Sequence, residues 1–297
     1  MKVLITGAAG NLGSHVSRHL MTTAHQLRLL IHKSPLQFDT VHHSNIGVCR
    51  ADLGQPNSLR EVSSGVDCVV HFAGVLFAPL PERFLPKTNI GYVKNLVTVA
   101  RDAGVRKFVL MSFPHVEGNT DPDHRATGRL DRPSRVVHFR TRLKAEKYLL
   151  EACKGTAMTP VVFRAGIVYG PEIKLVQAAR WMLRHRLMAI WNKPTWAHLI
   201  ALPDFLSALQ AVIENWSAKR HLPDLRRLSN HSARFSRPVG GSFWLRASVA
   251  TACADSSYCG SHCRSCGSES AYTGSTQSRH REGGYDILRR RYFPDET

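Results

Sequence analysis

The chain has 297 residues, of which 43% are hydrophobic, and its formal net charge is +18. The apolar fraction is ordinary for a globular protein. No apolar run reaches the length of a membrane span and no signal peptide precedes the first predicted strand, so we expect a cytoplasmic protein. The basic charge favours anionic ligands. No Lys/Arg run with interleaved aromatic residues indicates specific binding to nucleic acid.

Predicted strands and helices alternate along the first 219 residues. The expected strands, in chain order, are 2–6, 27–31, 66–72, 107–112 and 160–168. The expected helices are 14–21, 89–103, 141–153, 178–187 and 204–215. This alternation predicts an α/β domain with a doubly wound, mostly parallel sheet and helices on both of its faces.

A glycine-rich turn joins the first predicted strand to the first predicted helix. Its sequence, from Gly7 to Gly13, is G-A-A-G-N-L-G. In this context Gly7 permits a tight turn, Gly10 lets the backbone approach a pyrophosphate, and Gly13 lets the helix pack closely on the strand. The free N–H groups at the start of the helix attract phosphate. The turn, including Asn11 and Leu12, is therefore predicted to bind a dinucleotide.

The end of the second predicted strand indicates which dinucleotide is bound. An acid at this place bonds the ribose hydroxyls of NAD, whereas a basic group accommodates the extra phosphate of NADP. The sequence here is His32-Lys33-Ser34, which has no acid. NADP is therefore the preferred cofactor and NAD the alternative. The interpretation of Lys33 as a plain solvated surface lysine stays open.

Several stretches of the chain resemble one protein family. The turn and the preceding Thr6 resemble the T-G-x-x-G-x-x-G fingerprint of extended and atypical short-chain dehydrogenases/reductases, the NAD-dependent epimerase/dehydratase group. The resemblance covers about residues 1–218 and implies a Rossmann domain over residues 1–219 that binds NAD(P). It also implies that Asp52 and Leu53 contact the adenine. The stretch that it places beneath the cofactor is Phe72-Ala73-Gly74, and the other matching stretches are Thr88-Asn89, Asn95-Leu96 and Arg164 with Val168-Tyr169-Gly170-Pro171.

The catalytic pattern of this family is altered. Its enzymes use a Tyr-x-x-x-Lys pair, in which the lysine lowers the tyrosine pKa so that the phenol exchanges a proton during hydride transfer. One alignment of the matching helix puts His138 at the tyrosine place and Arg142 at the lysine place. Sliding the alignment by two residues restores Lys144 but puts Arg140 at the tyrosine place. Neither alignment supplies a tyrosine.

Three residues remain candidates for catalysis. In the family, a Ser or Thr after the fifth strand holds the substrate oxygen. Here Ser112 is present, but Phe113 occupies the position that is most often catalytic. The side chain of His138 exchanges a proton near neutral pH, and Arg142 nearby would favour the neutral imidazole. The alternative is that His138 only begins a helix and that Arg142 faces solvent or phosphate.

Two functions follow from these patterns. The first is an NAD(P)-dependent oxidoreductase, or an enzyme similar to sugar-nucleotide epimerases, that acts on an unidentified small molecule. The second is a non-catalytic cofactor-binding protein that serves as a regulator, redox sensor or assembly factor, and the absent tyrosine favours it. No metal site is expected, and oligomer formation is left open.

The periodic patterns end after Lys219, and we expect residues 220–297 to form an irregular tail in place of a substrate lobe. When Tyr285–Thr297 is back-translated with free codon choice and moved by one nucleotide, M-T-Y-F-A-A-D-T-S-R-M-K is a permitted reading, and it resembles a late segment of the family. Arg220–Asp224 similarly permits G-I-Y-P-T. We therefore hypothesise a shifted reading frame near Lys219. A competing and weaker hypothesis is a zinc site, whose ligands would be Cys253, Cys259, Cys263 and Cys266.

Overall fold

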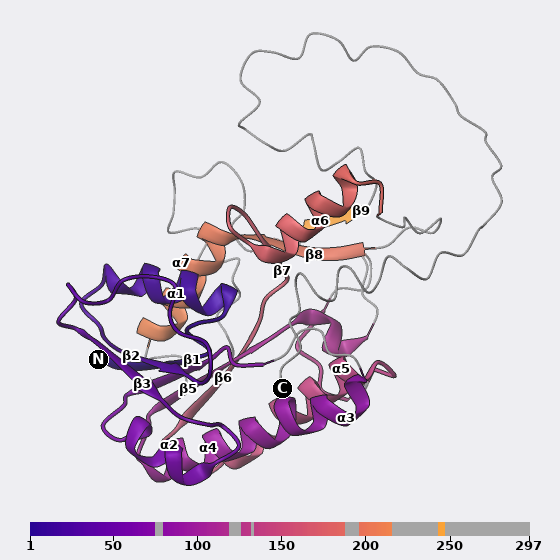
Figure 1. Cartoon of the computed structure of the whole chain (residues 1–297). Helices are drawn as coiled ribbons and strands as arrows, with labels where there is room; N and C mark the ends of the chain where they lie inside the picture. Colours follow the sequence, from indigo (N-terminus) through magenta and orange to yellow (C-terminus); the bar gives the residue numbers. More distant parts are fainter. Residues whose placement is uncertain (75–79, 119–125, 132–133, 188–195, 216–242, 247–297) are drawn as a thin grey trace, which may run out of the picture. The chain divides into compact units, whose positions relative to one another are not determined.

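The structure is a computed structural model that describes residues 1–74, 80–118, 126–131, 134–187, 196–215 and 243–246. The chain divides into two compact units, Met1–Thr251 and Ala252–Thr297, and the second unit lies outside the described residues. The described part of the first unit contains a large sheet and a small sheet (Figure 1).

The large sheet has six strands in the order β3-β2-β1-β4-β5-β6, and each neighbouring pair is parallel. Its strands are β1 (Lys2–Thr6), β2 (Gln26–Ile31), β3 (Ile46–Arg50), β4 (Cys68–His71), β5 (Lys107–Ser112) and β6 (Thr159–Arg164). The strand order reverses between β1 and β4. In doubly wound sheets, ligands bind at this switch point, outside the carboxyl ends of the strands. The predicted α/β class is confirmed.

Helices cover both faces of the large sheet (Figure 1). Helices α1 (Asn11–Met21) and α7 (Leu202–Glu214) lie on one face, and α2 (Pro56–Ser63), α4 (Tyr92–Asp102) and α5 (Val137–Ala152) lie on the other. Side chains alternate between the two faces along a strand. Accordingly, Ile5 belongs to the core beneath α1 and α7, whereas Leu4 belongs to the core beneath the other three helices. Both cores consist mainly of aliphatic side chains.

Shorter elements complete the described chain. A short helix, α3 (Pro81–Leu85), continues into the π-helix η1 (Pro86–Gly91), and the 3-10 helix η2 (Pro114–Glu117) follows β5. The small sheet has the order β7-β8-β9, with a parallel and then an antiparallel pair. Its elements are β7 (Ile167–Tyr169), β8 (Trp196–Ala201) and β9 (Phe243–Arg246), and helix α6 (Lys174–Arg184) lies between β7 and β8 in the chain.

The structure corrects the expected strand 160–168. This segment forms two strands, β6 and β7, which belong to different sheets. Between them, a Cβ atom on Gly166 would lie 2.6 Å from the carbonyl oxygen of His198, so glycine lets the small sheet approach the end of β6. Strands β3 and β8 were not expected. The expected helix 89–103 corresponds to η1 and α4 together. The expected helix 178–187 corresponds to α6, which begins four residues and ends three residues earlier in the chain.

The region expected to be an irregular tail is described only at β9, which pairs with β8. The rest of residues 220–297, including the four clustered cysteines and the segments that motivated the reading-frame hypothesis, lies outside the described residues. No group of three or more His, Cys, Asp or Glu side chains is arranged to hold a metal within the described ranges.

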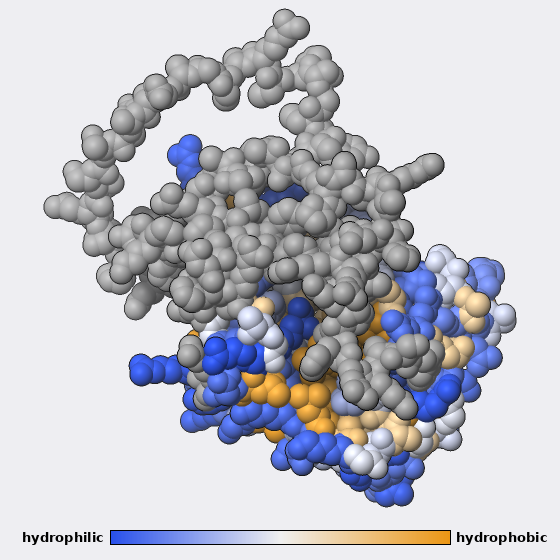
Figure 2. Space-filling model, turned by 180° about the vertical axis from the view of Figure 1, so that it is seen from behind, coloured by the Kyte–Doolittle hydropathy of each residue, from blue (hydrophilic) through white to orange (hydrophobic). Residues whose placement is uncertain are grey.

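On the face seen in Figure 2, the described residues are mainly hydrophilic, and hydrophobic residues gather among them. Among the described helices, none is both long and apolar enough to cross a membrane.

Lys107 joins the start of β5 to the end of α7. Its side chain is only 2% exposed, and its Nζ donates hydrogen bonds to the carbonyl oxygens of Val212, Ile213 and Asn215 at 2.8, 3.0 and 2.7 Å. The last carbonyls of a helix lack partners within the helix and carry partial negative charge. The ammonium group therefore satisfies these carbonyls and holds α7 against the sheet.

We predict that Lys107→Met lowers the free energy of unfolding by about 2–4 kcal/mol, because it leaves buried carbonyls without a charged donor. Chemical denaturation measures the change. Lys154→Met is the matched control, since the Lys154 side chain is 71% exposed and pairs with exposed Glu151. This control should change stability by less than about 0.5 kcal/mol. Equal stability of the two variants would contradict the prediction.

Candidate functional site

The turn between β1 and α1 has a geometry that requires glycine. Gly7 has a φ of +73°, and a Cβ atom there would lie 2.7 Å from the amide nitrogen of Ala73. A Cβ atom on Gly13 would lie 2.1 Å from the carbonyl oxygen of Gly7. At Gly10 the corresponding distance to the same oxygen is 3.0 Å. The turn therefore folds back closely on itself and lies against the chain that follows β4.

Helix α1 begins at this turn without a side chain that caps its N-terminus. The side chain of Asn11 instead contacts the segment between β7 and α6. Its Nδ2 donates to the carbonyl oxygen of Glu172, and its Oδ1 accepts from the backbone N–H of Lys174, both at 2.9 Å. Arg18, which lies further along α1, pairs with the Glu172 carboxylate at 3.0 Å. Leu12 is half-buried against the core.

The chain after β4 lies beside the turn. Thr6 Oγ1 and His71 Nδ1 are 2.8 Å apart, and both side chains are buried. Burial, with a smaller effect of Arg142, lowers the pKa of His71 to about 3, so its imidazole is neutral. Phe72, Ala73 and Gly74 follow directly, and a Cβ atom on Gly74 would lie 3.1 Å from Nη2 of Arg142. Gly74 thus allows the guanidinium on α5 to reach the loop after β4.

Basic groups meet at the ends of β2 and β3. The guanidinium of Arg50 donates to the carbonyl oxygen of His32. The ring of His32 lies 3.9 Å from the carboxylate of Asp52, whose Oδ1 accepts from the backbone N–H of Gly54. Lys33 is exposed. Arg50 was not among the residues predicted from the sequence, although its place at the end of β3, close to the predicted adenine contact, is a usable signal.

Leu53 is the buried neighbour of Asp52. Its backbone carbonyl accepts a hydrogen bond from Nδ2 of Asn95 at 2.8 Å. This contact fixes the loop after β3 to α4, so the two residues that the family resemblance places at the adenine are held at the carboxyl end of the sheet.

Helix α5 carries His138 and Arg142, which one of the two alignments with the family places at the tyrosine and lysine positions. His138 and Arg142 are one helical turn apart, so their side chains share a face. The two ring nitrogens of His138 are buried, and so is Nε of Arg142, and none of the three has a hydrogen-bond partner in the part of the chain that the structure describes. Burial, and secondly the charge of Arg142, lowers the pKa of His138. Burial also lowers the pKa of Arg142 to about 10, which leaves it charged at neutral pH.

Ser112 points to a buried charge network. Its hydroxyl donates to the Glu146 carboxylate on α5. The guanidinium of Arg164 lies between two carboxylates, 2.5 Å from Glu146 Oε2 and 2.5 Å from Glu117 Oε1. Glu117 also accepts from the backbone N–H groups of Thr127 and Gly128. The hydroxyl of Ser112 is thus engaged within the protein, and Glu117, Glu146 and Arg164 form a network that sequence analysis did not anticipate.

The arrangement fits a nicotinamide dinucleotide. Buried polar groups normally have hydrogen-bond partners. Here the Oδ1 atom of Asn89 is also buried and unpartnered, on η1 beside α5. Asn89 and Arg142 both lie near Gly74, at 4.0 and 3.1 Å from a Cβ placed there. Ribose hydroxyls are donors and acceptors of the kind that these atoms lack.

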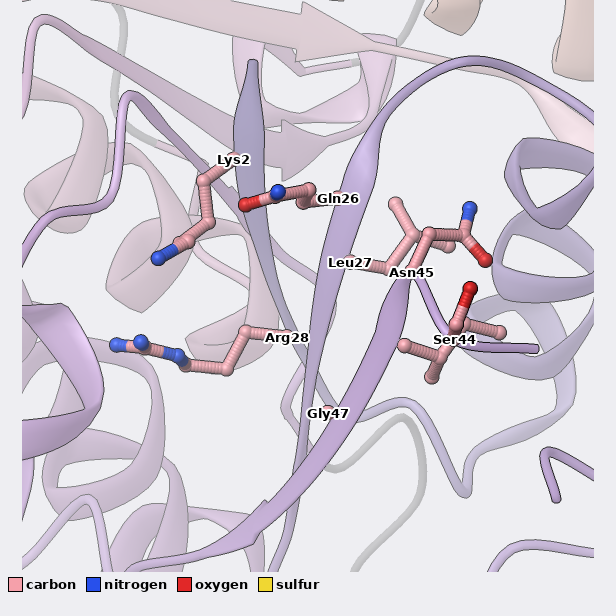
Figure 3. Close-up of a pocket in the computed structure, with 8 residues that line it drawn as sticks. Lys2, Gln26, Leu27, Arg28, Ser44, Asn45 and Gly47 are labelled. Atoms are coloured by element: carbon pink, nitrogen blue, oxygen red, sulfur yellow. The ribbon is translucent and has the colours of Figure 1, made fainter.

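A separate cavity lies at the amino ends of the strands, away from the glycine turn. It has a volume of about 310 Å³ and is lined by residues at the amino ends of β1, β2 and β3, which include Lys2, Gln26 and Arg28 (Figure 3). The guanidinium of Arg28 is already bonded to the carbonyls of Glu61, Val62 and Ser64. None of the residues predicted to bind cofactor or substrate lines this cavity.

The sheet order, the switch point and the glycine turn define the class of dinucleotide-binding Rossmann proteins. The sequence model of the NAD dependent epimerase/dehydratase family matches residues 3–213, and the chain belongs to this family. The resemblance noted from the motifs is thereby confirmed.

Relatives match parts of the chain. An uncharacterized protein, y4nL, of Sinorhizobium fredii is 30% identical over 184 residues, which are 57% of this chain and 51% of that protein. The uronate dehydrogenase of Pseudomonas syringae pv. tomato is 34% identical over 119 residues, 39% of this chain and 41% of the enzyme. The chain therefore spans about half the length of the curated relatives that it matches.

The solved structure of MoeE5 in complex with UDP-glucuronic acid and NAD has a TM-score of 0.62 to this chain. The sequences are 23% identical, and the match covers 73% of this chain and 74% of MoeE5. This likeness confirms the fold.

We predict that Gly10→Val weakens dinucleotide binding by about tenfold or more, because the added side chain occupies the face that a pyrophosphate approaches. Calorimetric titration with NADP(H) and NAD(H) measures the change. Gly47→Val in strand β3 is the control, since the nearest atom to its new Cβ is 4.0 Å away. Undiminished affinity of the Gly10 variant would exclude the turn as the binding site.

Proposed function

We propose that this protein binds a nicotinamide dinucleotide at the β1–α1 turn and is an oxidoreductase or epimerase-like enzyme in which His138 and Arg142 replace the family's tyrosine and lysine. The observation that carries the proposal is the set of buried, unpartnered polar atoms on Asn89, His138 and Arg142. These atoms lie at the carboxyl edge of the sheet, and the guanidinium reaches the cofactor side at Gly74. The name of the uronate dehydrogenase relative supports the same reaction class.

Each residue of the site has a proposed role. The backbone of Gly7, Gly10, Asn11, Leu12 and Gly13 would hold the pyrophosphate. The adenine half would lie against Asp52 and Leu53, and Phe72, Ala73 and Gly74 would pass beneath the cofactor. A bound nicotinamide supplies or accepts a hydride.

His138 would move the proton. Its neutral imidazole accepts the proton of a substrate hydroxyl at a ring nitrogen during oxidation and returns it during reduction. Burial, and secondly the charge of Arg142, lowers the pKa of His138 and favours the neutral imidazole. Arg142 would also hydrogen-bond a ribose hydroxyl. Ser112 would act indirectly, because its hydroxyl holds Glu146 on the same helix.

We further propose that NADP(H) binds at least as well as NAD(H). The support is the basic character of the β2 and β3 ends, where Arg50 bonds the carbonyl of His32 and the exposed Lys33 is the next residue in the chain. The competing charge is Asp52, which is 3.9 Å from the His32 ring and already accepts a backbone hydrogen bond.

Lys33→Glu should weaken NADP(H) binding by about tenfold and leave NAD(H) binding nearly unchanged, because only NADP(H) carries the extra phosphate. Paired titrations with both cofactors test this, with exposed Lys154→Glu as the control of equal charge change. Clearly tighter binding of NAD(H) by the unaltered protein would contradict the preference.

The second candidate is a non-catalytic cofactor-binding regulator, redox sensor or assembly factor. It is favoured by Phe113, which occupies the usual hydroxyl position, and by the imidazole at position 138. The two candidates differ in one observable quantity. An enzyme shows cofactor-dependent hydride transfer that His138→Gln reduces, whereas a regulator binds cofactor without such turnover.

We predict that Arg142→Met raises the pKa of His138. The guanidinium disfavours the imidazolium, so its removal lets the ring protonate at a higher pH, although burial still acts in the opposite direction. NMR titration of the histidine rings measures this pKa in the apo protein. In a turnover assay, the pH below which the rate falls should also move to a higher value. Arg101→Met, far from the site on α4, is the control. Identical His138 titration in both variants would show that Arg142 does not tune the ring.

A further inference from the structure

A short turn, which we call the strap, joins the small sheet to α6. It consists of Gly170-Pro171-Glu172-Ile173 and lies between β7 and the first residue of α6, Lys174. The backbone N–H of Ile173 donates to the carbonyl oxygen of Gly170, which closes the turn. The proposed function assigns no role to the strap.

Both ends of the strap are fixed to the core. Ile173 is only 3% exposed and belongs to the core beneath α1 and α7. A Cβ atom on Gly170 would lie 3.0 Å from Cβ of Leu202, the first residue of α7, so glycine lets the strap pack closely there. Glu172, between these anchors, is exposed. A change in the shape of the strap is therefore confined to its middle.

The middle of the strap has an unfavourable backbone conformation. Glu172 has a φ of +62°, which residues with a Cβ atom rarely adopt. In a four-residue turn, proline is favoured at the second place, and a positive φ at the third place normally requires glycine. Pro171 and Glu172 occupy these two places. Such a conformation persists only where the surrounding contacts hold it.

Helix α1 supplies contacts that hold Glu172. Asn11, the first residue of α1, donates through Nδ2 to the Glu172 carbonyl oxygen and accepts at Oδ1 from the backbone N–H of Lys174, both at 2.9 Å. The second bond also satisfies the first N–H group of α6, whose own N-cap residue, Ile173, supplies no side-chain bond. Arg18 pairs with the Glu172 carboxylate, but both side chains are exposed, so this pair contributes little. The Asn11 amide is therefore the main clamp on the strap.

The same residue belongs to the proposed cofactor site. The backbone N–H groups of Asn11 and Leu12 open α1, where the proposed function places the pyrophosphate. A bound pyrophosphate would fix the backbone of Asn11, and with it the base of the side chain that clamps the strap. The amide then loses less freedom when it makes its two hydrogen bonds. By thermodynamic linkage, the clamped strap favours dinucleotide binding by the same factor.

We propose that the Asn11 side chain is a positioning residue that couples the dinucleotide site to α6. It holds the strap in its strained turn, and bound dinucleotide tightens this hold. The inference rests on the proposed function for the identity of the ligand. The end of β7 and the start of α6 then keep one arrangement while the dinucleotide is bound.

The test follows the backbone amide of Lys174, because its hydrogen is bonded to Asn11 itself. Hydrogen exchange of the full chain is read residue by residue, with and without saturating NADP(H) or NAD(H). In the unaltered protein, we expect dinucleotide to slow exchange at Lys174 by about fivefold or more. Asn11→Ala keeps the backbone N–H that a pyrophosphate needs. It should speed exchange in the absence of ligand, remove most of the effect of dinucleotide, and lower dinucleotide affinity by a similar factor.

Two further variants separate the clamp from a general loosening of the fold. Asn45→Ala removes a bond of the same kind, from Asn45 Nδ2 to the carbonyl oxygen of His25 at 2.9 Å, at the amino ends of the strands. It should leave Lys174 exchange and dinucleotide affinity unchanged. Glu172→Gly keeps Asn11 and both backbone bonds but relieves the positive φ. The strap should then stay clamped without ligand, so that Lys174 exchange is slow and dinucleotide slows it little further.

The outcomes distinguish the coupling from the proposed function. If dinucleotide binds the unaltered protein without slowing Lys174 exchange, or slows it equally in Asn11→Ala, the inference is overturned and the proposed function stands. If neither NADP(H) nor NAD(H) binds, the proposed function fails and the coupling fails with it. Thermal melting shows whether Asn11→Ala is folded. If it is not, Glu172→Gly decides, and a dinucleotide effect on Lys174 exchange as large as in the unaltered protein overturns the inference.

Discussion

The position of α5 depends on a guanidinium held between two buried carboxylates. Arg164 at the end of β6 reaches Glu146 on α5 and Glu117 in η2, and the Ser112 hydroxyl completes the coordination of Glu146. Removing one partner of such a group leaves an uncompensated buried charge, which is far more costly than the net gain of forming the pair. The network therefore specifies one arrangement of β5, β6 and α5. The positions of His138 and Arg142, which both lie on α5, depend on that arrangement.

In the proposed alignment, a histidine and an arginine in place of a tyrosine and a lysine would change the chemistry that the helix offers. A phenol needs help to lose its proton near neutral pH, which an adjacent ammonium provides. An imidazole is already neutral there, and burial keeps it so. Arginine retains its charge even when buried and presents a planar set of donors. The pair thus favours a neutral base beside a permanent cation.

The local patterns of the sequence were sufficient for the sheet class and for the glycine turn, because strand, glycine spacing and helix follow one another within residues 2–21. They could not reveal contacts that join distant segments. The approach of Arg142 to Gly74 depends on how α5 crosses the sheet, and the carboxylate partners of Arg164 come from two separate elements, η2 and α5. His198 belongs to β8, a strand that was not expected. Ser112 was correctly located at the end of β5, but its hydroxyl partner Glu146 could only be found in three dimensions.

The hydrogen bonds of Lys107 set an order on the folding of this domain during its synthesis. The chain emerges from the ribosome with Lys107 more than a hundred residues ahead of its acceptors, and the last of them is the carbonyl of Asn215. Until that residue has emerged, the ammonium at the base of β5 must remain hydrated, and the sheet face that α7 covers stays open. The last of these acceptors lies at the end of α7, before β9 in the chain. The large sheet and the helices that cover it can therefore be completed during translation before β9, which pairs with β8 in the small sheet, has emerged.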